Sequence, residues 1–193
     1  FTAPYIAAAA ASAADSARIE LLPEADSFTQ ITDENVTGIE GLVEAYQANN
    51  GAGYVFTSKA KGYGGDLFVM TGINSEGQVT KVKLMENAET PGLGSRVGED
   101  EYTSQYVEKD SKLEGVEAVS GATISSVAFK DAVSIAFQAY GAAAGVEVEV
   151  PAEPEVDPRT EIFPGEELTP IEIEGADEAY QAGSGGIIIA VQV

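Results

Sequence analysis

Two short segments rich in glycine and hydroxyl side chains hold the residue types best suited to chemistry. The first is Ser120-Gly121-Ala122-Thr123, with Ser125 just beyond it, and a run with helical spacing follows directly. Unpaired N–H groups and the dipole at a helix N-terminus favour a phosphate group. Gly121 and Ala122 leave the backbone accessible, and Thr123 offers a hydroxyl for a phosphoester. The segment therefore indicates an anion site anchored at Thr123.

The same residues also fit a purely structural role. Serine and threonine are among the commonest N-cap residues, so Ser120 or Thr123 is equally suited to accept a hydrogen bond from the first helical turn. Capped helices are far commoner than modified ones. The segment by itself leaves both interpretations open and favours the cap.

The second segment is Glu89-Thr90-Pro91-Gly92-Leu93-Gly94, which lies upstream of the first. Its proline and two glycines form a turn in which backbone amides can approach a planar ligand. An ordinary surface turn explains the same composition, so this segment too has two interpretations when taken alone.

The amino-acid composition excludes several kinds of catalytic site, metal site and partner. Cysteine and histidine are absent, which excludes disulfides, iron–sulfur clusters, zinc–thiolate sites, cysteine nucleophiles and a Ser/His/Asp triad. With 32 acidic and 10 basic residues, the formal net charge is −22, which repels nucleic acid and anionic membrane surfaces. We therefore expect no catalytic residue, no metal site and no nucleic-acid partner.

Apolar spacing predicts the elements that position these segments. Residues 126–144 carry Val133 and Phe137 at helical spacing and end near Gly145, which predicts a long amphipathic helix. Residues 53–74 predict a hairpin with Lys-Gly-Tyr-Gly-Gly as its turn. Residues 78–85 predict a half-buried strand, and residues 42–50 a short helix or turn closed by Asn-Asn-Gly.

The opening stretch is apolar and rich in small residues, and its first residue is Phe rather than Met. Alanine dominates residues 7–17, which predicts a helix that Pro23 ends. We interpret residues 1–20 as a membrane-proximal helix that follows an anchor not in this chain. The alternative is an alanine-rich helix of an ordinary domain.

The C-terminal part contains a partial repeat. Residues 146–158 alternate acid and valine and then become proline-rich, which predicts a strand running into a stiff linker. Beyond them, residues 173–182 match residues 39–48 at eight of ten positions. We expect a partial second copy of the first domain's start, with a chance match as the alternative.

Taken in order, the two segments and the following helix resemble the FMN-binding domain of RnfG and NqrC subunits of ion-pumping, NADH-linked redox complexes. The hairpin turn also matches, with Tyr63 and Gly64 in the family's glycine-tyrosine segment. The order of features is more similar to RnfG, over roughly residues 1–145. Two positions depart from the family pattern, Glu117 in place of Asp and Asn87 in place of His.

The resemblance implies FMN attached covalently through its phosphate to Thr123 by a flavin transferase of the ApbE type. It implies an electron carrier on the extracytoplasmic face of the cell membrane, relaying electrons among the subunits of an Rnf-type complex rather than acting as an independent enzyme. The other residues that it places at the cofactor are Ser120, Gly121, Ala122, Ser125, Glu89, Thr90, Pro91, Gly92, Leu93, Gly94, Tyr63 and Gly64.

The expected fold is α+β, a twisted, mainly antiparallel sheet flanked by helices. We expect the FMN-binding domain over residues 21–145, an acidic proline-rich linker over 146–160 and the partial second copy over 161–193. Two other functions fit the same residues, a stand-alone extracellular flavin electron-transfer protein and a non-redox acidic cell-surface binding module.

Overall fold

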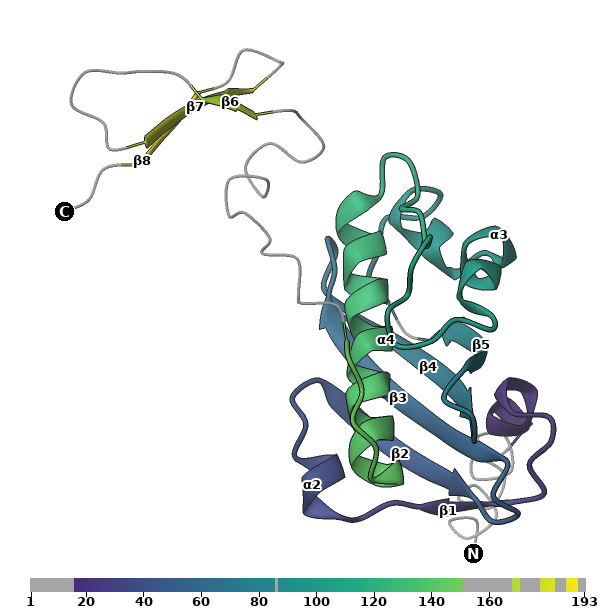
Figure 1. The fold of residues 1–193 in the computed structure, drawn as a ribbon. Coiled ribbons are helices and arrows are strands. Elements are labelled where there is room, and N and C mark those ends of the chain that lie inside the picture. The colour runs from purple at the N-terminus through teal and green to yellow at the C-terminus, as the bar shows by residue number, and fades with distance from the viewer. Residues whose placement is uncertain (1–15, 86, 151–167, 171–177, 183–186, 191–193) are drawn as a thin grey trace, which may run out of the picture. The chain divides into compact units, whose positions relative to one another are not determined.

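A five-stranded antiparallel sheet with one long helix across it forms the framework of the first part of the chain (Figure 1). The computed structural model describes residues 16–85, 87–150, 168–170, 178–182 and 187–190. The chain divides into two compact units, residues 1–152 and 153–193. In the first unit the strands follow chain order across the sheet: β1 (Phe28–Gln30), β2 (Leu42–Ala48), β3 (Gly53–Lys61), β4 (Asp66–Asn74) and β5 (Val79–Leu84).

The β3–β4 hairpin is the longest pairing in the sheet. Its register runs without a break from Gly53 opposite Asn74 to Lys61 opposite Asp66. Residues 62–65 make the turn, where Gly65 takes a φ of 144° that glycine adopts without strain. The predicted hairpin, its turn and the strand that became β5 are confirmed.

Helix α4 (Thr123–Ala144) packs on β3 and β4 and confirms the predicted long helix. Phe129, Val133 and Phe137 are fully buried on its sheet-facing side, and small alanines between them let the helix approach the strands closely. The helix ends at Gly145, which has a φ of 68° and donates its N–H to the Gly141 carbonyl.

The prediction for residues 42–50 was wrong for residues 42–48, which form β2 rather than a short helix or turn, while residues 49 and 50 form the predicted closing turn. Glu44, Ala45 and Gln47 have weak strand preference. Pairing with β1 on one side and β3 on the other supplies the backbone partners, and a register shift between Leu42 and Glu44 breaks the alternation that marks a strand. Tertiary pairing therefore decides this segment.

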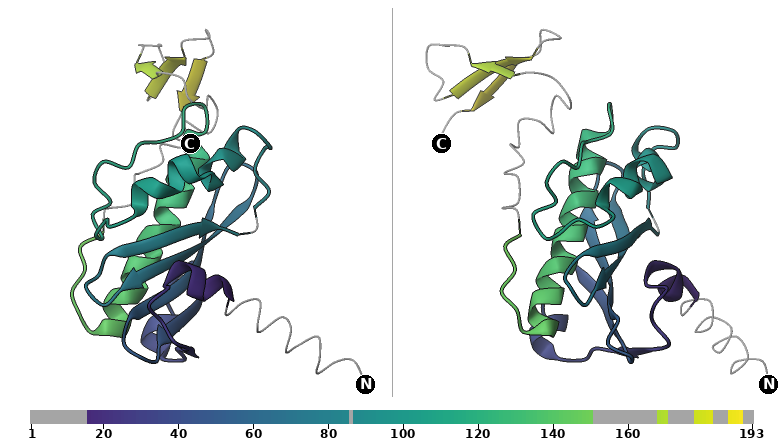
Figure 2. Two further views of the ribbon diagram at one scale, coloured as in Figure 1. Left: turned by 90° about the vertical axis from the view of Figure 1, so that its right-hand side faces the viewer. Right: turned by 45° about the vertical axis from the view of Figure 1, so that its right-hand side comes forward.

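The other face of the sheet is covered by helical turns at residues 16–21, coloured purple in Figure 2. Leu21 and Leu22 are buried against Val55 and Met70. Glu20 in the same turns forms ion pairs with Lys81 and Lys83 of β5. This helix ends before Pro23, as predicted, while the larger part of residues 7–17 lies outside the described residues.

Three short helical segments connect β5 to α4. They are η1 (Gly94–Gly98), α3 (Asp100–Thr103) and η2 (Ser104–Tyr106). Tyr102 and Tyr106 contact Phe129 of α4 with ring centroids 5.4 and 5.2 Å away. This aromatic cluster seats the connection against the first half of α4.

After α4, residues 146–150 form no strand and are held on the first unit by individual contacts. Val148 and Val150 pack against the core, and the Ser111 hydroxyl donates to the Glu149 carbonyl at 2.6 Å. The predicted strand at 146–158 is therefore wrong for these five residues, while residues 151–158 lie outside the described ones.

The second unit contains an antiparallel sheet with the order β6 (Leu168–Pro170), β7 (Glu178–Ala182) and β8 (Ile187–Ala190). Its register places Leu168 opposite Ala182 and Tyr180 opposite Ile188. Together with the first unit it confirms the expected α+β class and antiparallel pairing.

Candidate functional site

The three segments singled out in the sequence meet at one buried carboxylate. Glu89 is only 6% exposed. Its Oε2 accepts a hydrogen bond from the Ser125 hydroxyl in the first turn of α4 at 2.6 Å, and its Oε1 accepts one from the Gly64 N–H at the hairpin turn at 3.2 Å. The hairpin turn, the Glu89–Gly94 loop and the start of α4 therefore form one site.

Glycines create the space that this carboxylate occupies. A Cβ on Gly62 would collide with Glu89 Oε1, and one on Gly94 would collide with Oε2 and lie 2.8 Å from the Ser125 hydroxyl oxygen. A Cβ on Gly64 would collide with the Ala88 carbonyl. The backbone approach at Gly64 excludes a side chain, whereas a side chain at Gly62 or Gly94 would displace the Glu89 carboxylate from its present position.

Thr123 is exposed at the first position of α4, and the helix start has no side-chain cap. The N-cap residue is Ala122, so neither Ser120 nor Thr123 fills the capping role that the sequence favoured. The first N–H groups of the helix have no acceptor within the helix. A hydroxyl beside unpaired donors suits an attached phosphate.

The loop that leads into α4 is fixed by Ser126, which sequence reasoning missed. Its hydroxyl donates to the Ala122 carbonyl at 2.9 Å and accepts from the Val119 N–H at 2.9 Å. Gly121 takes a φ of 78° within this loop, and a Cβ there would contact Leu93 at 3.4 Å. The Ser-Gly-Ala-Thr loop and the Glu89–Gly94 loop thus lie in contact.

The predicted site residues divide into two groups. Glu89, Gly94, Ala122 and Ser125 are buried and form the support. The exposed members are available to a ligand: Tyr63, Gly64, Thr90, Pro91, Gly92, Leu93, Ser120, Gly121 and Thr123. Tyr63 and Leu93, with 65% and 47% exposure, are the two large side chains of this exposed group.

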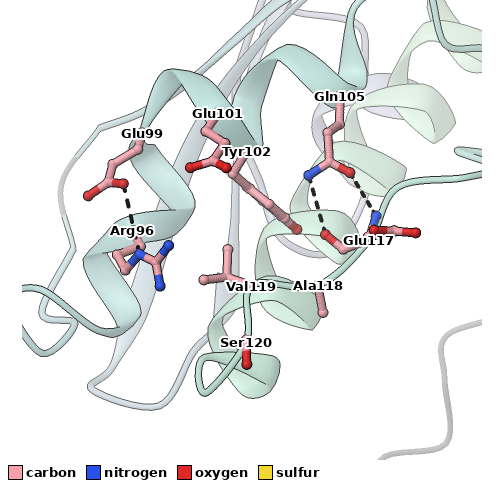
Figure 3. A pocket seen from close by; sticks show the side chains of 9 residues that line it. All are labelled: Arg96, Glu99, Glu101, Tyr102, Gln105, Glu117, Ala118, Val119 and Ser120. Carbon is pink, nitrogen blue, oxygen red and sulfur yellow. Dashed lines mark hydrogen bonds and ion pairs between the residues drawn. The ribbon is translucent and has the colours of Figure 1, made fainter.

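A polar pocket of about 210 Å³ is lined in part by the segment that ends at Ser120 (Figure 3). Gln105 binds the backbone of Glu117 in both directions, accepting its N–H at 2.9 Å and donating to its carbonyl at 3.4 Å. Only Ser120 belongs to the predicted site. The lining residues are Arg96, Glu99, Glu101, Tyr102, Gln105, Glu117, Ala118, Val119 and Ser120.

Two buried tyrosines, Tyr102 and Tyr106, support the first turn of α4. The Tyr102 hydroxyl donates to the Ser126 carbonyl at 3.0 Å and lies 2.8 Å from the Tyr106 hydroxyl, which donates to it. Burial raises the pKa of both Tyr102 and Tyr106 above the ordinary value of 10.0, so both phenols keep their protons and these hydrogen bonds in alkaline as well as neutral solution. They serve as rigid supports for the loop that carries Thr123.

Comparison with known proteins shows which family this chain is similar to. Residues 62–138 match the model of the FMN-binding domain. The chain is 34% identical over 149 residues to the G subunit of the Na(+)-translocating ferredoxin:NAD(+) oxidoreductase complex of Acetobacterium woodii, covering 64% of this chain and 72% of that protein. It is 33% identical over 139 residues to the G subunit of the ion-translocating oxidoreductase complex of Methanosarcina acetivorans, covering 65% and 74%.

This chain belongs to the family of FMN-binding G subunits. A third relative, the G subunit of the proton-translocating ferredoxin:NAD(+) oxidoreductase complex of Clostridium ljungdahlii, is 28% identical over 134 residues, with 64% of this chain and 69% of that protein covered. The stretch matched by the family model contains every predicted site residue. The resemblance seen in the sequence is thereby confirmed.

The residues present fit the cofactor that the matching domain is named for. The exposed Thr123 hydroxyl and the uncapped helix start suit a phosphate, while Tyr63 and Leu93 offer apolar surface to a flat ring. Among the described residues, no cluster of acidic side chains could hold a metal ion. No helix in the described part of the chain is long and apolar enough to cross a membrane.

Proposed function

We propose that this chain is an electron-carrier subunit that holds FMN through a phosphoester bond to Thr123 and relays electrons in an Rnf-type membrane redox complex. The observation that carries the proposal is the exposed Thr123 hydroxyl at the uncapped start of α4, inside the stretch that matches the FMN-binding domain. FMN supplies one- and two-electron redox chemistry when bound.

The chain's own residues contribute retention and placement. In the ester, Thr123 Oγ1 replaces one phosphate oxygen, so the chain gains the mass of FMN less one water. First-turn N–H groups are proposed to hold the phosphate, with Ser120, Gly121 and Ala122 beside it. Tyr63, Gly64 and the loop from Thr90 to Gly94 are proposed to contact the ring.

The proposed partners are the other subunits of such a complex, because the relatives are G subunits of multi-subunit oxidoreductases. A flavin transferase of the ApbE type is the proposed maturation enzyme. We place the domain on the extracytoplasmic face, where a covalent bond prevents loss of the cofactor by dilution. Protease added to intact cells should then cleave the chain, and full resistance there, with cleavage after lysis, would reject this location.

We also propose that residues 161–193 are a partial second copy of the start of the domain, which we assign to residues 21–145, joined by an acidic linker over 146–160. The strand order β6-β7-β8 parallels β1-β2-β3, and Thr169 pairs with Gln181 as Thr29 pairs with Gln47. Cross-strand NMR contacts between residues 169 and 181 are expected. A shifted register would contradict the duplication.

The deciding experiment is the intact mass and peptide map of the protein from its native host, where any required transferase is present. FMN less one water is expected on the peptide that contains Thr123. Thr123→Val should abolish this mass and the flavin fluorescence of the denatured protein. Thr37→Val, at an exposed threonine of α2 (Glu34–Thr37), serves as the control and should retain both.

A protein from the native host with no covalent flavin at Thr123, Ser120 or Ser125 would reject the covalent carrier. A flavin mass on Ser120 or Ser125 instead would keep the carrier and reject the assigned residue. Absence of any flavin would leave the acidic binding module as the function to test.

A further inference from the structure

We propose that Glu89 is a positioning residue that sets the hairpin turn against the start of α4 and lowers the reduction potential of a flavin on Thr123. This inference rests on the proposed function for its electrochemical half. Its structural half concerns the protein alone. Both halves follow from how the Glu89 carboxylate is held.

Both oxygens of this carboxylate are engaged by other motif segments. Oε2 accepts from the hydroxyl of Ser125 at 2.6 Å, a short bond typical of an ionised acceptor. Oε1 accepts from the N–H of Gly64 at 3.2 Å, next to the exposed Tyr63. Glu89 therefore acts through its neighbours, and its removal would free the hairpin turn from the helix that carries Thr123.

The residues around the Glu89 carboxylate pack closely against it. Gly62 and Gly94 lie against its two oxygens so closely that a Cβ at either position would displace the carboxylate. The hairpin turn, the Glu89–Gly94 loop and the start of α4 thus surround the Glu89 carboxylate, each with a glycine that leaves space or with a hydrogen-bond donor. Close packing of this kind fixes a side chain in one rotamer and transmits its position to the backbone around it.

The charge of Glu89 is stabilised without a cation. Among the described residues it makes no ion pair, and its oxygens lie at the first turn of α4, where the helix dipole favours a negative charge. A poorly solvated charge acts over a longer range than a surface charge. Because this carboxylate is hydrogen-bonded to Ser125, two residues beyond Thr123, it disfavours the addition of an electron to a flavin attached at Thr123.

Two substitutions of Glu89 separate the effect of its two hydrogen bonds, which tether the hairpin turn to α4, from the effect of its charge. Glu89→Gln removes the charge but can keep both contacts, because its amide oxygen accepts from Gly64 and its NH₂ donates to the Ser125 hydroxyl. Glu89→Ala removes both contacts. Glu76→Gln and Glu76→Ala change the net charge equally at an exposed carboxylate in the β4–β5 turn and serve as controls.

The tether is tested by amide hydrogen exchange on the flavin-free protein. Gly64 is exposed, so its N–H depends on this hydrogen bond for protection. Glu89→Ala should quicken exchange at Gly64 roughly tenfold or more, while the Glu76 variants leave it unchanged. If Glu89→Ala does not fold, Ser125→Ala, which removes only the helix contact, should quicken the same amide by a smaller factor.

The charge is tested by redox titration of the flavin-loaded protein. Glu89→Gln should shift the midpoint potential to a more positive value than Glu76→Gln does. Unchanged exchange at Gly64 in a folded Glu89→Ala would overturn the positioning role, and a potential that is unchanged or more negative in Glu89→Gln would overturn the electrostatic role. Absence of flavin from the wild type would reject the proposed function, with the exchange result still deciding the tether.

Discussion

Glu20 is an exposed carboxylate shared by two lysines of β5. Its Oε1 lies 2.7 Å from the Lys81 Nζ, and its Oε2 lies 2.7 Å from the Lys83 Nζ. Hydrogen bonds from Lys81 and Lys83, followed by the attraction of their charges, lower the pKa of Glu20 from 4.5 to about 2. This group therefore links the helical turns at 16–21 to the edge strand of the sheet.

The lowered pKa of Glu20 makes its contribution to stability dependent on pH. Because the folded pKa lies below the unfolded one, the contribution is complete above about pH 4.5 and is lost as the pH falls toward about 2. Glu20→Gln should lower the thermal midpoint slightly at pH 7, since exposed bridges are screened by water. The gap between wild type and variant, followed by circular dichroism, should close between about pH 4.5 and about pH 2.

Glu24→Gln changes an exposed carboxylate outside this bridge and controls for the change in net charge. A gap between wild type and Glu20→Gln that stays constant throughout this acid range would show that the bridge does not stabilise the fold.

At the site, residue types alone indicated Thr123 and the glycine-rich loops but not how they are supported. The partner of Glu89 is Ser125, 36 residues away, and the loop before α4 is held by Ser126 and Tyr102. No spacing rule connects these positions, because the turns between β5 and α4 bring them together. Thr123 and the glycine-rich loops remain predictions as a cofactor site, and the contacts that orient them were not predictable from sequence.

Among the elements, those with strong local signals were predictable. The β3–β4 hairpin has a glycine-rich turn and alternating strands, and α4 has sustained helical spacing. Strand β2 was not predictable, because its residues favour a helix or turn and its partners lie in β1 and β3. The short segments η1, α3 and η2 lack the length that a periodic pattern needs.

The segment after α4 is an element without regular structure whose packing predicts a measurable contribution. Val148 is half-buried on the core, and a Cβ on Gly141 would collide with it. Val148→Ala should lower the free energy of unfolding by about 1 kcal/mol, because it removes the packing of two half-buried methyl groups. Denaturant unfolding at pH 7 measures this difference.

Val146→Ala provides a matched control for Val148→Ala, because Val146 is 48% exposed and lies in the same segment. Its substitution should change the free energy of unfolding by no more than about 0.5 kcal/mol. Equal effects of the two substitutions would show that the segment does not pack on the domain in solution.

The whole molecule carries a formal net charge of −22, with only 10 basic residues to offset the 32 acidic ones. Self-repulsion on this scale opposes the compact state, and salt screens it over a Debye length of about 10 Å at 0.1 M. The thermal midpoint should therefore rise when sodium chloride is increased from low to moderate concentration at pH 7. Potassium chloride should act equally, since screening does not depend on the cation.

A midpoint that falls with salt would mean that ion pairs such as those of Glu20 outweigh the repulsion. A difference between the two salts would indicate a specific cation site instead of screening.

At this scale the sequence predicted a repeat in the C-terminal part, and the structure places three strands there. The prediction rested on identity between residues 39–48 and 173–182, of which β2 and β7 are the strands. Matching letters indicate matching local structure.

Helix α4 packs in the core and also carries Thr123 at its start, and this determines how long the proposed site persists. Twelve of its 22 residues are buried, and Thr123 is its first residue. Elements at the centre of a core open only when the whole domain unfolds, whereas peripheral loops open many times more often. Beyond the fraying of its first turn, the helix that begins at Thr123 therefore shares the kinetic lifetime of the fold, and substitutions that slow global unfolding should prolong the life of the proposed site in equal measure.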